Sequence, residues 1–78
     1  MSDIDEIYRK KKLEMTINDL KAMDNYYETL DRLMKELNEH EREGRDTAHR
    51  KVLNEIIKVN NNITHTEKRI KNRLGYSY

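Results

Sequence analysis

Residues 39–46 read Glu-His-Glu-Arg-Glu-Gly-Arg-Asp, and Gly44 in this stretch separates two long segments that contain neither glycine nor proline. The second glycine, Gly75, follows the later of these segments. Glycine often follows the last residue of a helix, because it adopts the left-handed backbone conformation at no steric cost. The sequence therefore predicts one domain over 1–78, with a helix from about 3 to 43, a turn at 44–46, a helix from about 47 to 74 and a flexible tail at 75–78. Ser2 and Asp46 are the expected N-cap residues.

Apolar residues recur every three or four positions in both predicted helices, the spacing of one face of an α-helix. Because the connection is short, we expect the two helices to pack antiparallel along these stripes. Residues 1–39 carry a net charge of −3 and residues 40–78 a net charge of +4, which also favours this pairing. The first stripe contains Leu13, Ile17, Leu20, Met23, Tyr27, Leu30, Met34 and Leu37, and the second contains Ala48, Val52, Ile56, Val59, Ile63, Thr66, Ile70 and Leu74.

A second apolar row beside the first stripe widens the apolar surface of the longer helix to about half of its circumference, more than one partner helix can cover. We therefore predict an all-α antiparallel helical hairpin that forms a two-fold homodimer, a four-helix bundle. In two alternative interpretations this row binds a different protein, or the chain breaks near residues 9–13 and its first segment folds back. The row is the predicted partner or dimer interface and consists of Ile4, Tyr8, Met15, Ala22, Tyr26 and Leu33.

The composition excludes several classes of protein. The chain has 78 residues, 40% of them charged and 35% apolar, and a net charge of +1, so no overall charge excess indicates nucleic acid or an anionic membrane. Without cysteine it has no disulfide and no thiolate metal site, which fits a cytoplasmic protein. No apolar run approaches the roughly 20 residues of a membrane span.

Basic residues are nevertheless concentrated in two clusters, which an antiparallel hairpin would place together at its open end. We expect them to steer the approach of a partner, and binding of nucleic acid phosphates is the alternative function that they suggest. The clusters consist of Arg9, Lys10, Lys11 and Lys12 in the first helix and Lys68, Arg69, Lys71 and Arg73 in the second.

No pattern of catalytic residues is present in the sequence. The only serines are Ser2 and Ser77, and no histidine has the spacing that would place it beside a nucleophile and an orienting acid. Near the turn, His40, His49, Glu36 and Glu43 could hold a metal ion. We interpret them instead as part of a solvated, charged turn. We therefore predict neither enzymatic activity nor a cofactor or metal.

The predicted function is that of a non-enzymatic protein–protein interaction module. It would act as a small regulatory adaptor or inhibitor that binds a larger protein of unknown identity. The frequent Lys, Asn, Ile, Glu and Tyr residues suggest an AT-rich genome, such as that of a low-GC bacterium or its phage. Nucleic acid binding through the basic clusters, or a structural role as a coiled-coil assembly subunit, are the alternatives.

Overall fold

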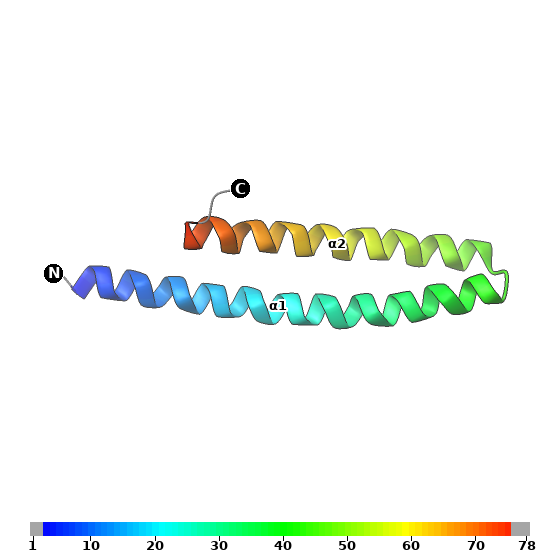
Figure 1. Ribbon diagram of the computed structural model, residues 1–78, viewed down its shortest axis with the longest axis horizontal. Coiled ribbons are helices and arrows are strands. Elements are labelled where there is room, and N and C mark those ends of the chain that lie inside the picture. The colour runs from blue at the N-terminus through cyan, green and yellow to red at the C-terminus, as the bar shows by residue number, and fades with distance from the viewer. Residues whose placement is uncertain (1–2, 76–78) are drawn as a thin grey trace.

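The computed structural model describes residues 3–75 as two helices, α1 (Asp3–Arg42) and α2 (Asp46–Leu74), which pack antiparallel as a hairpin (Figure 1). The predicted all-α hairpin is thus confirmed. α1 is continuous through residues 9–13, so the folded-back arrangement of the first segment does not occur. The proposed cap Ser2 and residues 76–78 of the expected tail lie outside the described residues.

The turn between the helices is built on Gly44, whose φ of +69° lies in the left-handed region. The amide of Gly44 donates to the carbonyl of Glu41 at 3.2 Å, and the amide of Arg45 donates to the carbonyl of His40 at 2.9 Å. These two hydrogen bonds form a Schellman motif, which satisfies carbonyl groups at the end of α1. The sequence therefore predicted the role of Gly44 correctly.

The start of α2 differs from the prediction. Arg45 is the N-cap residue, and its side chain makes no capping hydrogen bond. Asp46 is the first residue of the helix, so its predicted role as the cap is wrong. Its carboxylate instead lies in the first turn, where the helix dipole favours a negative charge. At the other end of α2, Gly75 has a φ of +81° and caps the helix as expected.

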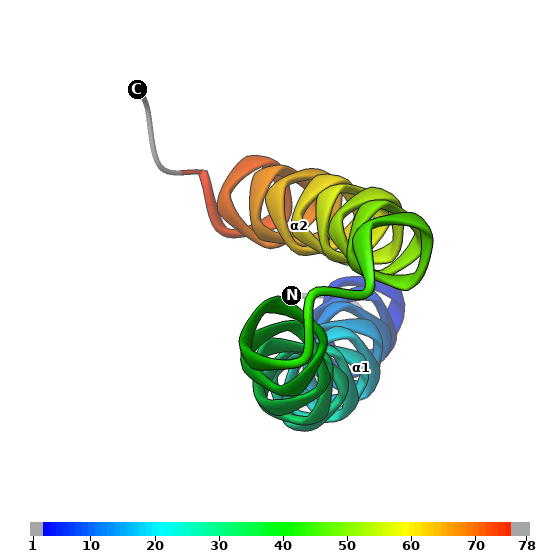
Figure 2. The same ribbon diagram turned by 90° about the vertical axis from the view of Figure 1, so that its right-hand side faces the viewer.

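The contact between α1 and α2, here called the seam, follows a spacing of alternating three and four residues along both helices. On α2 it uses the predicted stripe, in which Val52, Ile63 and Thr66 are buried. Leu74 was also predicted in this stripe but is 45% exposed, and Arg73 occupies the seam in its place. On α1 its two buried residues are Thr16 and Leu33. Figure 2, a view along the hairpin, shows one pair of helices with no further element of the described chain over either side. The hairpin therefore has a seam but no enclosed core.

Little apolar surface is buried as a result. Only Leu33, Val52 and Ile63 are buried apolar residues among those described, at 2%, 6% and 8% exposure. The chain exposes 6569 Å² of surface, whereas a folded monomer of 9.5 kDa is expected to expose about 5,000 Å². Within residues 3–75, neither helix contains an apolar segment long enough to cross a lipid bilayer.

The left-handed conformation of Gly44 leads to a prediction. No atom lies within 4 Å of a Cβ built at this position, so a substitution tests the backbone alone. We expect Gly44→Ala to lower the free energy of unfolding by about 1 kcal/mol, and Gly44→Asn to lower it less, because asparagine tolerates positive φ. Urea unfolding at fixed protein concentration, followed by circular dichroism, measures both, with the exposed helical substitution Glu41→Ala as the control. Equal stability of Gly44→Ala and the unmodified chain would contradict this account of the turn.

Candidate protein-interaction site

One side of the hairpin carries a row of large apolar side chains that α2 does not cover. Each of these α1 residues comes one position after a seam position in the sequence, and 48–59% of its surface is exposed. The sequence analysis assigned all of them to the contact with α2, and this assignment is wrong. The seam runs instead through Thr16, Asp19, Tyr26 and Leu33, which are buried or half-buried. The exposed row consists of Leu13, Ile17, Leu20, Tyr27 and Met34.

α2 adds three apolar residues to the same side. Leu53, Ile57 and Leu74 are 38%, 56% and 45% exposed. Leu74 and Leu13 line one shallow hollow, so the two helices present these residues on a common side. Leu53 precedes Leu74 by three heptads on a helix that keeps its seam, so it lies on the same side near the turn. Ile57 follows Leu53 by about one helical turn and therefore lies beside it, at the outer edge of this side.

We name these eight residues the apolar face. It has two clusters, one at each end of the hairpin. Tyr27 lies between them, slightly nearer to the turn. The cluster at the open end consists of Leu13, Ile17, Leu20 and Leu74, and the cluster toward the turn consists of Met34, Leu53 and Ile57.

The six residues predicted as an interface lie in different environments. Ile4, Tyr8 and Met15 are exposed, at 73%, 67% and 47%. Ala22 and Tyr26 are half-buried. Leu33 is 2% exposed and packs in the seam of its own chain. Only the N-terminal half of the predicted row is therefore accessible to another molecule in this hairpin.

This N-terminal half belongs to an overhang of α1 beyond the end of α2 (Figure 1). Arg73, in the last turn of α2, contacts Thr16, so α1 extends beyond α2 from about residue 14 toward Asp3. On the side opposite the apolar face, a hollow of about 290 Å³ lies where the overhang meets α2. It is lined by Tyr8, Lys11, Lys12, Met15, Asn72 and Arg73.

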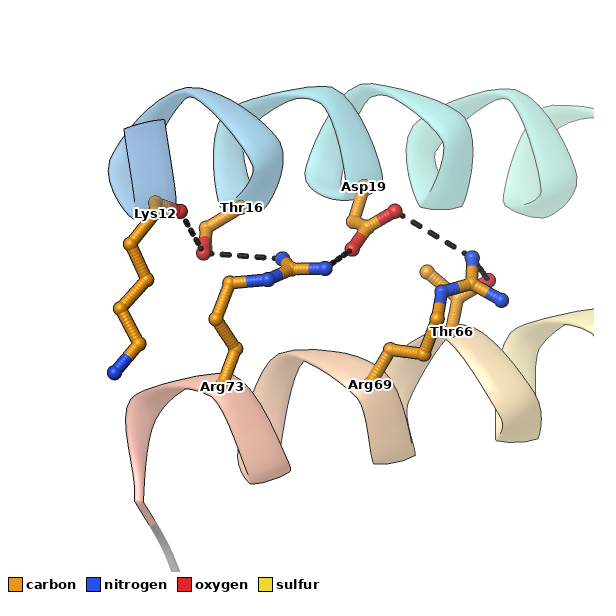
Figure 3. Close-up of polar contacts among 6 residues, drawn as sticks. All are labelled: Lys12, Thr16, Asp19, Thr66, Arg69 and Arg73. Atoms are coloured by element: carbon orange, nitrogen blue, oxygen red, sulfur yellow. Dashed lines mark hydrogen bonds and ion pairs between the residues drawn. The ribbon is translucent and has the colours of Figure 1, made fainter. Parts of the chain in front are cut away.

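An ion pair at the seam joins the helices near their open end (Figure 3). Arg73 Nη2 lies 2.8 Å from Asp19 Oδ2, and the two side chains are only 13% and 16% exposed. Arg73 Nη1 also donates to Thr16 Oγ1 at 3.2 Å, and this hydroxyl donates in turn to the carbonyl of Lys12 at 2.9 Å. The Asp19 carboxylate thus fixes the last turn of α2 against α1.

A second arginine joins the same carboxylate. Arg69 Nη2 lies 3.4 Å from Asp19 Oδ1 and donates to Thr66 Oγ1 at 3.2 Å, although 57% of its side chain is exposed. This cluster was not predicted from the sequence. The available signal was the spacing of Thr16 and Asp19, which continues the three-and-four spacing of Leu33 and Tyr26 toward the N-terminus.

These contacts change the environment of the predicted steering residues. Arg69 and Arg73 are directed at Asp19, and Lys71 Nζ lies 2.9 Å from Glu67 Oε1. Arg9, Lys10 and Lys11 are exposed, whereas Lys12 is half-buried with its Nζ 5.8 Å from the ring centroid of Tyr8. Lys68 is exposed on α2.

The candidate metal ligands His40, His49 and Glu36, near the turn, are all half-buried. In the part of the chain that the structure describes, no group of three or more His, Asp or Glu side chains is arranged to hold a metal ion.

Comparison of the chain with protein-family models, with curated proteins and with solved structures gives no match.

The Asp19–Arg73 pair leads to a prediction about stability. We expect Asp19→Ala to lower the free energy of unfolding by about 1–3 kcal/mol, because it leaves the half-buried guanidinium of Arg73 without its carboxylate. The double variant Asp19→Leu/Arg73→Leu is expected to be as stable as the unmodified chain or more stable, because it removes both charges from the seam.

Urea unfolding measures these changes, and Glu43→Ala is the matched control, since it removes the exposed ion pair with Arg45, a type of pair worth about 0.2–1 kcal/mol. If Asp19→Ala destabilises the chain no more than Glu43→Ala does, the pair of Asp19 and Arg73 has no special role in the seam.

Proposed function

We propose that this chain is a non-enzymatic protein–protein interaction module, which acts as a small adaptor or inhibitor by covering an apolar helical surface of a protein partner. The observation that carries the proposal is the apolar face, on which eight large apolar side chains remain 38–59% exposed on one side of the hairpin. Large exposed apolar side chains that gather on one side of a protein are typical of interaction sites.

The kind of partner follows from the geometry of the face. Two parallel rows of side chains on an elongated helical hairpin match the rows on another helix or helix pair. Met34 and Tyr27 suit such an interface, because methionine adapts its shape and tyrosine combines apolar area with a polar hydroxyl. The partner surface is therefore expected to be helical and apolar along its centre.

Nucleic acid binding is the second candidate function, through the exposed Arg9, Lys10, Lys11 and Lys68. Three of the four basic residues that α2 would contribute have acidic partners within the chain, which leaves fewer charges for phosphate groups. A mobility-shift assay at low salt tests this function directly. We expect no shift of either duplex or single-stranded nucleic acid, and a shift that Lys10→Glu/Lys11→Glu abolishes would favour the alternative.

Photocrosslinking tests the proposed function. p-Benzoylphenylalanine in place of Tyr27 samples the apolar face, and the same residue in place of the exposed neighbour Glu28 is the matched control. The purified chain is irradiated alone and in a lysate of the organism that encodes it, and the adducts are identified by mass spectrometry. We expect a protein adduct from position 27 that position 28 does not give. No protein adduct from position 27 in either sample contradicts the proposed function.

Two double variants distinguish the two exposed apolar surfaces of α1. Ile17→Glu/Met34→Glu charges the apolar face, and Tyr8→Glu/Met15→Glu charges the overhang on the opposite side. We expect the first variant to abolish the adduct from position 27 while the second retains it, with helicity measured by circular dichroism in both. The opposite result would assign the interface to Tyr8 and Met15.

A further inference from the structure

We propose that the apolar face is covered by a second copy of this chain. The two copies pack face to face with both turns at the same end of the bundle, so that α1 of each copy lies against α2 of the other. This inference rests on the proposed function, since it names the partner of the same face. It specifies a two-fold axis that runs along the length of a four-helix bundle.

The exposed area is sufficient for such a dimer. The 6569 Å² of the chain exceeds the surface expected for its mass by about 1,500 Å². A stable interface of ordinary size buries about 800 Å² on each partner. The face also runs along most of the hairpin, from Leu13 and Leu74 at the open end to Leu53 near the turn, so one copy can cover it over that length.

The apolar clusters of the two copies then meet at the same level along the bundle. Arg73 contacts Thr16, and Arg69 contacts Asp19. A residue of α1 and a residue of α2 therefore lie at the same level along the hairpin when their residue numbers add up to about 89. Leu74 is therefore level with the interval between Leu13 and Ile17. With the turns at the same end, Leu74 of the second copy faces this interval.

The same rule applies near the turn. Leu53 and Ile57 are level with positions on either side of Met34. With the turns at the same end, Met34 of one copy faces the interval between Leu53 and Ile57 of the other. Each cluster on α1 thus finds the apolar residues of α2 opposite to it.

Charge decides between this arrangement and the one with turns at opposite ends. α1 has eleven acidic and eight basic residues, a net charge of −3, and α2 has three acidic and seven basic residues, a net charge of +4. Turns at the same end place α1 against the oppositely charged α2 of the other copy. Turns at opposite ends place α1 against α1 and α2 against α2, which brings like charges together.

The edges of the apolar face show the same preference. The α1 row that contains Ile17 continues through Asp24 and Asp31, both acidic. The α2 row that contains Ile57 begins with Arg50 and ends with Lys71, both basic. With the turns at the same end, Asp24 and Asp31 lie between the levels of Lys71 and Arg50 of the second copy along the bundle, whereas with the turns at opposite ends each row lies beside its own copy.

Crosslinking of single-cysteine variants tests the arrangement, and the absence of native cysteine makes each probe unique. Glu43→Cys places a thiol at the turn, and Leu74→Cys places one at the open end on the apolar face, both at exposed positions. Each variant alone, and an equal mixture of the two, is treated with a short bis-maleimide after sedimentation has measured its mass. The two sites on one hairpin are separated by most of the length of α2, roughly 40 Å, which the reagent cannot span.

We expect a mass twice that of the 9.5 kDa chain and covalent dimers from each variant alone. Covalent dimers that form only in the mixture, by linking position 43 to position 74, overturn the proposed orientation. A monomer, or an assembly larger than a dimer, overturns the inference as a whole.

A pair of adjacent substitutions then tests the face itself. Ile17→Glu is expected to weaken the dimer at least 100-fold in sedimentation equilibrium, because it buries a charge in the interface. Asn18 is the next residue and lies outside the apolar face, so Asn18→Glu is expected to change the dimer dissociation constant less than threefold. Equal effects of the two variants would show that the apolar face is not the dimer contact.

The outcomes separate this inference from the proposed function. A monomeric chain whose position 27 crosslinks a different protein retains the proposed function and overturns the second copy as its partner. A chain that gives no protein adduct from position 27, alone or in lysate, overturns both.

Discussion

Two helices that pack side by side can cover only one narrow strip on each other, and the remaining properties of this hairpin follow from that constraint. A seam with three-and-four spacing occupies about two positions in every seven. α1, however, carries apolar residues on a wider arc than this. Leu33 can be buried only if its neighbour Met34 is left outside, and the same holds for Tyr26 and Tyr27. The exposed apolar face is therefore a direct consequence of a wide apolar helix paired with a single partner.

The seam also changes in character along its length. Near the turn it contains apolar residues such as Leu33 and Val52, and at the open end it contains Thr16, Asp19 and Arg73. A polar seam contributes less hydrophobic stabilisation than an apolar one, so the open end is held mainly by the contacts of the Asp19 carboxylate. This carboxylate also fixes the rotation of α1, because burying Leu20 in place of Asp19 would separate Arg73 from its partner.

The sequence was sufficient for the parts of the fold that depend on local chemistry. Gly44 and Gly75 end helices because of their own backbone freedom, and the α2 stripe is predictable because one strip of that helix is clearly more apolar than the rest. The rotation of α1 was not predictable in this way. Its two neighbouring rows share Met23, Leu30 and Leu37, and the row with more apolar residues is the exposed one. The decisive contact joins Asp19 to Arg73, more than fifty residues apart, and periodicity within one helix carries no information about it.

The rotation of α1 leaves two separate exposed surfaces, one from the stripe predicted to contact α2 and one from the row predicted as the interface. The apolar face lies on one side of the seam, and the hollow beside Tyr8 and Met15 lies on the other. A second copy on the apolar face would cover Leu13 and Ile17 but leave Tyr8 and Met15 exposed on the overhang. In a bundle with both turns at one end, two such overhangs project from the other end, together with the basic residues Arg9, Lys10 and Lys11. The dimer contact and the overhang would then use different residues, so the surface around Tyr8 and Met15 would stay accessible whether or not the two copies are associated.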